Sequence, residues 1–214
     1  MKKHLFVMSL IFTFGFCQAQ DHQDYLNNVV KINPFLFGRS EFQISYERYF
    51  NDRKSSIVLM PSYLLRDNGE NNIEGWQMMG QYRIYLTHYR KDQKKTFLNV
   101  YNYGFYAGLY ALYLDYEEQF TRNVYDPITF EYELNTYERS IQSYEGGALL
   151  GLQMDITKRI VLDFYVGGGL RKSEVEDSYL DFVEDQEYYS DYSVFDFAYT
   201  GVKPRVGLML GITF

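Results

Sequence analysis

Residues 205–214, Arg-Val-Gly-Leu-Met-Leu-Gly-Ile-Thr-Phe, decide the fold class. Every second residue from Val206 to Phe214 is large and apolar, whereas the residues between them are mostly small or polar. A period of two is typical of a β-strand whose two faces meet different environments. In a soluble sandwich the apolar face would be core, and in a membrane barrel it would face lipid. The aromatic residue in the last position favours the membrane barrel.

The N-terminal segment has the parts of a secretory signal peptide. A basic start precedes an apolar run at residues 5–16, and the small residue Ala19 precedes a suitable cleavage site. Lipoprotein processing at Cys17 is the alternative, but the phenylalanine before it is too large for that position. We therefore expect residues 1–19 to be a cleaved signal peptide, residues 20–28 a flexible mature N-terminus, and residues 29–214 an outer-membrane β-barrel.

Removal of the signal peptide changes the charge and the redox chemistry of the chain. The full sequence has 21 basic and 28 acidic residues, and Lys2 and Lys3 are removed, so the mature charge is 19 − 28 = −9. The single cysteine is removed as well, which excludes disulfide and thiol chemistry in the mature chain. With 23 tyrosines and 17 phenylalanines the composition is strongly aromatic. No later apolar run reaches about 18 residues, so we expect no membrane-spanning helix.

The rest of the chain repeats the alternation and predicts eight strands, an even number as a closed antiparallel meander requires. They are expected at residues 29–37, 41–47, 56–65, 76–87, 101–116, 140–155, 160–173 and 205–214. Their connections alternate between short and long, apart from a tight first turn at residues 38–40, which is the outer-membrane pattern. A soluble β-sandwich or lipocalin-like barrel has no reason to sort its loops by end. We therefore predict an all-β fold, an eight-stranded antiparallel up-and-down transmembrane β-barrel.

The inward faces predict a filled interior, because eight strands leave a lumen just wide enough for side chains. Inward glycines are expected to leave space for long side chains from opposite strands. These glycines are Gly147, Gly151, Gly167, Gly169, Gly207 and Gly211. The inward charged residues, which are the candidate ion pairs, are Lys31, Glu47, Arg83, Glu145, Asp163, Arg171 and Arg205.

Strand direction sets the depth of these charges and predicts two clusters. Glu47 and Arg83 should meet in the periplasmic half, near Lys31 and Asp163. Nearer the extracellular mouth, Glu145 should meet an arginine of the last two strands. Because a buried charge must be paired, we interpret both clusters as a structural plug of salt bridges. A proton or ion path is the alternative, and it would fail if Glu145→Ala and Arg83→Ala opened no conductance.

Candidate catalytic groups are few. Of the three histidines, His4 is removed with the signal peptide, His22 lies in the mature N-terminus, and His88 ends a strand at the periplasmic rim. None is expected near a serine and a carboxylate at one level of the barrel, so a Ser-His-acid hydrolase is not supported. No His or Cys spacing indicates a metal site. We expect no enzymatic activity, no cofactor and no metal.

The connection before the last strand is acidic and aromatic. Between Ser173 and Lys203 it has nine carboxylates and no lysine or arginine. This charge excludes nucleic acid as a partner, and no calcium loop of the EF-hand type is seen. We interpret the segment as a contact surface for a cell-surface partner or glycan, or alternatively as a solvated extension of the strands. The residues of the candidate surface are Tyr179, Phe182, Tyr188, Tyr189 and Tyr192.

Several short motifs follow one another along the chain. They begin with Lys-Ile-Asn-Pro-Phe-Leu-Phe-Gly at 31–38 and Gln-Ile-Ser-Tyr-Glu-Arg at 43–48, and they continue at residues 80–85, 104–108, 146–151, 161–169 and 205–214. In this order they resemble the opening hairpin and the later strands of a domain-of-unknown-function barrel family that is common in Bacteroidota. The resemblance covers nearly all of residues 29–214 except two long loops. It implies a small eight-stranded outer-membrane barrel without a known activity, and it transfers no site.

We therefore expect a monomeric protein of the cell outer membrane, embedded in lipid, with a structural or surface-interaction role. Long acidic, Tyr-rich extracellular loops would carry that role by contacting an extracellular ligand. The alternatives are a narrow pore for ions or small solutes and a lipid-modifying outer-membrane enzyme. The barrel-assembly machinery is the expected partner during insertion, and Phe214 is expected at the periplasmic interface, where that machinery could read it.

Overall fold

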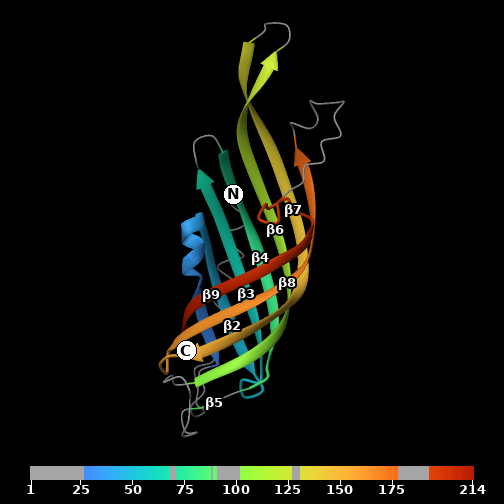
Figure 1. Ribbon diagram of the computed structural model, residues 1–214. Helices are drawn as coiled ribbons and strands as arrows, with labels where there is room; N and C mark the ends of the chain where they lie inside the picture. Colours follow the sequence, from blue (N-terminus) through green and yellow to red (C-terminus); the bar gives the residue numbers. More distant parts are fainter. Residues whose placement is uncertain (1–26, 68–70, 88, 91–101, 127–130, 178–192) are drawn as a thin grey trace, which may run out of the picture.

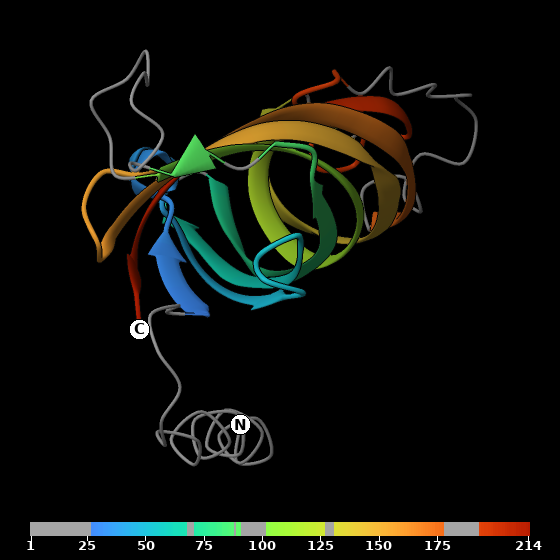
Figure 2. The ribbon, with the colours of Figure 1, turned by 90° about the horizontal axis from the view of Figure 1, so that it is seen from below.

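The computed structural model describes residues 27–67, 71–87, 89–90, 102–126, 131–177 and 193–214, and these form one antiparallel sheet that closes into a ring (Figures 1 and 2). The elements are β1 (Asn28–Ile32), η1 (Pro34–Arg39), β2 (Glu41–Phe50), β3 (Ser55–Asp67), β4 (Asn71–Tyr85), β5 (Tyr89–Arg90), β6 (Asn102–Asp126), β7 (Glu131–Asp155), β8 (Ile160–Asp177) and β9 (Gly201–Thr213). The predicted all-β, closed antiparallel fold is confirmed.

The ring has eight strand positions. Its order is β4, β3, β2, β1, β9, β8, β7 and β6, and a ladder between β4 and β6 closes it. The short strand β5 pairs with β6 at Tyr89↔Tyr103, just beyond the last β4 pair, Tyr85↔Tyr106, so β4 and β5 share one position. None of the helices in the described part of the chain has the length and apolar character that a membrane crossing requires.

The two faces of the sheet differ as the alternation predicts, with polar groups inside the ring and apolar groups outside. On β2 the inward residues are Glu41, Gln43, Ser45, Glu47 and Tyr49, all buried. The outward residues include Phe42, Ile44 and Phe50, with exposed fractions of 52%, 37% and 39%. A soluble protein of this size would hide most such side chains. The outer wall of the ring therefore presents a broad apolar surface.

Aromatic side chains form a row across five neighbouring strands of the outer wall. The register pairs Phe42 with Tyr63 and Tyr63 with Trp76. The ring of Trp76 lies 5.3 Å from that of Tyr113, which lies 5.1 Å from that of Tyr144. We call this set the outer aromatic row. It lies towards the end of the ring that carries η1 and the β6–β7 hairpin, called the upper end here as in Figure 1.

The first strand is shorter than predicted. It ends at Ile32, and residues 34–39 form the 3-10 helix η1 instead of continuing the strand to Phe37. Pro34 has no backbone N–H to give to a ladder, and the Asn33 side chain accepts a hydrogen bond from the Phe35 N–H, which caps the helix. Ser40 then closes the turn in the left-handed region, with φ 58°.

The predicted long loop at residues 117–139 is also wrong. β6 continues to Asp126 and β7 begins at Glu131, with uninterrupted pairing from Asn102↔Asp155 to Asp126↔Glu131. The segment is therefore a hairpin that stands well above the rest of the ring (Figure 1). β8 likewise continues to Asp177, beyond the predicted end of its strand at residue 173. In this protein the strands themselves extend past the ring's upper rim.

Pro61 lies within β3 and leaves the strand intact. The β2–β3 ladder pairs Gln43 with Ser62 and Tyr46 with Leu59, and Pro61 lies opposite the interval between these pairs. Proline lacks the N–H donor that a rung needs, which explains the interruption. On its other side Pro61 keeps its register with Met78. The alternation continues through it, with Met60 and Ser62 inside the ring.

Candidate functional site

Four charged side chains meet inside the lower half of the ring, and their exposed fraction is 0%. Lys31 on β1 lies 2.5 Å from Glu47 on β2 and 2.5 Å from Asp163 on β8. Arg83 on β4 lies 2.6 Å from Asp163 and 3.6 Å from Glu47. We call these residues the lower cluster. Two cations balance two anions, which is the condition under which buried charges are tolerated.

Tyrosine hydroxyls complete the lower cluster. Tyr106 donates a hydrogen bond to Asp163 at 2.7 Å, and Tyr85 donates one to Glu47 at 3.0 Å. The Arg83 Nη2 atom has no hydrogen-bond partner among the described residues, but the guanidinium lies 4.3 Å from the centre of the Tyr106 ring. A cation over an aromatic face is stabilised by the ring quadrupole, which compensates in part for the missing bond.

An apolar layer lies above the lower cluster. Met60, Met79, Leu149 and Met209 are inward-facing and at most 3% exposed. Along β9, Met209 lies between Gly211, which is paired with Lys31, and Arg205 of the upper half. These side chains separate the two charged levels of the interior. Two buried polar side chains also touch the layer: the Gln81 amide lies 3.1 Å from the Met79 sulfur, and the Ser45 hydroxyl lies 3.9 Å from the Met209 sulfur.

A second charged group, the upper cluster, consists of Glu145, Arg171 and Arg205. Arg205 donates from Nε at 2.6 Å to one oxygen of the Glu145 carboxylate and from Nη2 at 2.8 Å to the other. Arg171 donates from Nε at 2.8 Å, and the Tyr110 hydroxyl donates at 2.7 Å. The two-point contact of Arg205 is the stronger kind of carboxylate pairing. The structure thus joins all seven predicted charges into two groups.

A segment that the sequence did not single out covers the upper cluster. Residues 193–200, which we call the strap, run across the ring before β9. Ala198 is 2% exposed, and the ring of Phe197 packs edge-on against Tyr116 at 4.7 Å. Arg171 donates to the Phe197 carbonyl at 3.3 Å, and the Ser173 hydroxyl donates to the Tyr199 carbonyl at 2.9 Å. The strap therefore packs over the interior.

Lys203 fixes the beginning of the strap. Its ammonium donates to the carbonyl of Asp196 at 3.1 Å and to that of Val194. Asp196 in turn accepts from the Ala198 N–H at 2.9 Å. A signal was available in the sequence, since residues 193–200 contain one carboxylate whereas residues 174–191 contain eight. That change in charge density marks where the acidic connection ends and a packed segment begins.

The atoms nearest to a side chain added at the inward glycines come mainly from neighbouring strands, and at Gly169 also from the Tyr110 hydroxyl two strands away, whereas we expected the opposite wall. A Cβ atom on Gly207 would lie 2.3 Å from the ring of Tyr165, its register partner on β8. A Cβ on Gly151 would lie 2.2 Å from the ring of Tyr106, its partner on β6. Each of these two tyrosine rings therefore occupies the space that a side chain on its partner glycine would need. This placement brings the Tyr106 hydroxyl to the lower cluster.

Several predicted positions lie outside the described residues. These are His4, His22, His88, Tyr179, Phe182, Tyr188, Tyr189 and Tyr192. Residues 1–26, which include the expected signal peptide, also lie outside them. Within the described part of the chain, no group of three or more His, Cys, Asp or Glu side chains could hold a metal ion. The charged groups of the interior are engaged with one another.

A small cavity at the lower end is lined in part by Tyr49, Arg53, Tyr85 and Asp155. Arg53 and Asp155 form an ion pair of 2.8 Å beside it, and Tyr85 separates it from the lower cluster.

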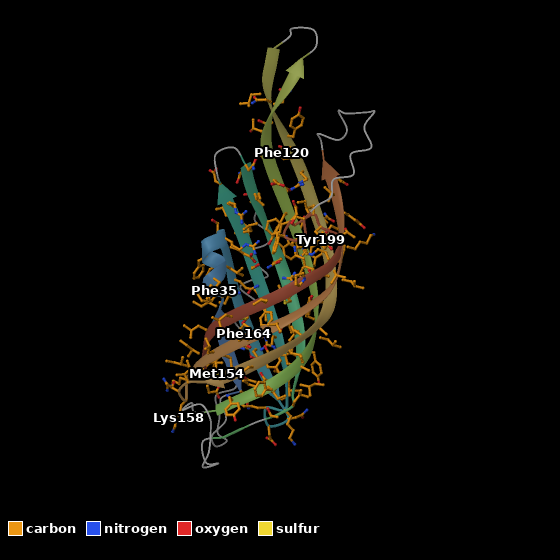
Figure 3. All side chains as sticks on the ribbon, viewed as in Figure 1. Phe35, Phe120, Met154, Lys158, Phe164 and Tyr199 are labelled. Atoms are coloured by element: carbon orange, nitrogen blue, oxygen red, sulfur yellow. The ribbon has the colours of Figure 1, made fainter. Side chains whose placement is uncertain are left out.

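No family model, curated protein or solved structure matches this chain. Figure 3 shows the side chains along the ring, from Lys158 at the lower turns to Phe120 near the base of the hairpin.

Proposed function

We propose that this protein is a small, non-conducting β-barrel of the bacterial outer membrane, which presents the β6–β7 hairpin at the cell surface in a structural or interaction role. The observation that carries the proposal is the distribution of side chains across the wall. Exposed apolar residues face outward from the full-length strands, and paired charges face inward. Lipid-embedded barrels need this inside-out arrangement.

The height of the apolar band fits a bilayer. On β4 and the residues after it, the outward apolar side chains run from Trp76 to Leu86, with exposed fractions of 45% and 65%. Ten steps at about 3.3 Å each span about 33 Å along the strand, or about 25 Å along the barrel axis at a tilt near 40°. That is the height of the lipid-facing band in outer-membrane barrels. The outer aromatic row lies where an interfacial girdle is expected.

The filled interior supports a structural role over the alternative of a pore. An ion passing through would have to cross the apolar layer and separate Lys31 and Arg83 from Glu47 and Asp163, which have no exposed surface. Separating a buried ion pair costs about 3–5 kcal/mol. At the upper end the strap adds a further layer over Glu145. A barrel packed in this way can hold its hairpin rigidly without conducting.

The proposal is tested by vesicle insertion and surface labelling. The protein is expected to insert into phospholipid vesicles, to leave planar-bilayer conductance at its baseline, and to yield a protease-resistant barrel after the hairpin is clipped. In cells, Asn123→Cys should react with a membrane-impermeant maleimide, whereas Ser56→Cys, buried inside the ring, should not. A protein that stays monodisperse in water without detergent, or that conducts ions steadily, would overturn the proposal.

A further inference from the structure

Side-chain contacts hold the base of the β6–β7 hairpin, and above that base neither of its two strands pairs with a further strand among the described residues. At the base, Gln119 donates to Glu138 at 3.0 Å, and the rings of Phe120 and Tyr137 lie 5.9 Å apart. An ion pair between Arg139 and Glu118 adds to these contacts. Cross-strand pairs of this kind stabilise a two-stranded ribbon that would otherwise be marginal in water. The hairpin is therefore held as an extension of the wall.

Above this base, β6 loses its neighbour. The β4–β6 ladder begins at Asn71↔Phe120, whereas β6 itself continues to Asp126. In the described part of the chain, no strand pairs with residues 121–126 on the side away from β7. We call residues 121–126 the β6 edge.

The direction of the backbone groups along this edge follows from the lower part of β6. The Phe105 carbonyl accepts from the Leu86 N–H at 2.8 Å, so the backbone groups of Phe105 point towards the β4 side. The registers of β6 with β4 and β7 advance without a bulge. Because backbone groups alternate in direction along a strand, the groups of Thr121, Asn123 and Tyr125 point to the open side. The β6 edge thus presents donors and acceptors in strand spacing.

Charge indicates what this edge accepts. The arms of the hairpin, residues 117–126 and 131–139, contain six carboxylates and two arginines, a net charge of 2 − 6 = −4. A second copy of this chain would bring another −4 to the contact and be repelled. An extended segment rich in lysine or arginine would be attracted, and its backbone would satisfy the open groups.

We propose that the β6 edge binds an extended, basic peptide segment of another protein, which adds to the barrel wall as a further strand. The inference rests on the proposed function, since it names the kind of partner that the protruding hairpin would take. Backbone hydrogen bonds supply the affinity, and the carboxylates of the hairpin select basic sequences. The partner is recognised by conformation and charge.

The test uses the mature protein in detergent and a fluorescent seven-residue peptide of alternating lysine and valine. Asn123→Pro removes an N–H from the open side and leaves the β6–β7 rungs in place, so binding should weaken about tenfold, equivalent to about 1.4 kcal/mol. Thr136→Pro is the matched control. Thr136 lies opposite Thr121, so its N–H also points away from the hairpin interior, but towards the other side. Its effect should stay within about twofold, and weaker binding with Thr136→Pro but not with Asn123→Pro would place the peptide on β7 and overturn the proposal.

A second probe does not depend on the folding of any variant. The same peptide with alternate backbone nitrogens methylated keeps its charge but cannot pair along an edge, so it should bind about tenfold more weakly or less. Equal binding of both peptides, equal binding to Asn123→Pro and wild-type protein, or self-association through the hairpin would overturn the proposal. The assay needs no bilayer. Binding without vesicle insertion would therefore refute the proposed location alone, and insertion without binding would refute the edge alone.

Discussion

Arg205 donates two hydrogen bonds to the Glu145 carboxylate, from Nε at 2.6 Å and from Nη2 at 2.8 Å. Arg171 approaches the same carboxylate from β8, so one anion holds two cations inside the ring. The Glu145 side chain has an exposed fraction of 0%, whereas that of Arg205 is 17%. The anion is thus the group on which the upper cluster depends.

Replacement of that anion should destabilise the barrel. Glu145→Gln keeps the shape but leaves two arginines without a counter-charge, so the free energy of unfolding should fall by about 3 kcal/mol, the low end for a buried pair because Arg205 reaches solvent. Urea titration in vesicles measures it. Glu174→Gln is the control, because Glu174 pairs with Lys172 on the open surface and should leave the midpoint unchanged. Equal midpoints for both variants would contradict the assigned role.

The lower cluster should behave as a coupled unit. Lys31→Met and Asp163→Leu each leave an unpaired buried charge, and each should lower the free energy of unfolding by about 3–5 kcal/mol. The double variant removes both members of a 2.5 Å pair and should cost clearly less than the sum of the two. A double-mutant cycle measures the difference. Additive losses would show that the two side chains do not interact in the folded protein.

Gly207 should tolerate no side chain. A Cβ there would lie 2.3 Å from the Tyr165 ring, so Gly207→Ala should displace the ring and cost about 1–3 kcal/mol of unfolding free energy. The matched control is Gly80→Ala, whose new Cβ would lie 4.0 Å from the Leu59 side chain. Thermal or urea unfolding compares the two variants. Similar losses at both positions would mean that backbone freedom, not space, requires the glycine.

The strap supplies a pair of phenylalanines for comparison. Phe197 packs against Tyr116, whereas Phe195 is 80% exposed. Phe197→Ala should lower the free energy of unfolding by about 2 kcal/mol and increase amide exchange in the strap, and Phe195→Ala should change neither measurably. Hydrogen exchange read by mass spectrometry resolves the segment. Equal protection of the strap in both variants would contradict its packing over the interior.

The faces and depths of the charged residues could be predicted from the sequence. Strict alternation assigns a side chain to the interior, and the position along an up or down strand sets its height. Two rules therefore sufficed to place Glu145 with Arg205 and Glu47 with Arg83. It was harder to predict which side chains the inward glycines accommodate, because whether these come from a neighbouring or an opposite strand depends on how far each strand is shifted relative to the next around the ring. That quantity is a property of the whole sheet.

The upper end of the barrel could not be predicted in the same way. Residues 117–123 have polar side chains at both odd and even positions, so the alternation that marks a strand fades, and the sequence predicts a loop at residues 117–139. The error at residues 29–37 had a local cause, since Pro34 breaks the ladder that the alternation suggested. The strap depends on contacts between residues far apart in the chain, such as Phe197 with Tyr116.

The seam where β1 meets β9 is short: it has pairs from Val29↔Thr213 to Ile32↔Leu210 and two further backbone hydrogen bonds between Asn28 and Phe214. Lys31 lies on this seam and reaches across β9 to Asp163 on β8, while it also holds Glu47 on β2. The ion pairs of Lys31 thus link β1 to β8 and β2 inside the ring, at the seam that has the fewest backbone hydrogen bonds between strands. Separation of β1 from β9 therefore requires the Lys31 ammonium group to leave a carboxylate on one or both sides. The ring therefore opens at this seam only when water reaches the lower cluster. A barrel under lateral tension should keep its seam closed until these charges become hydrated, and the strands should then separate in a single cooperative step.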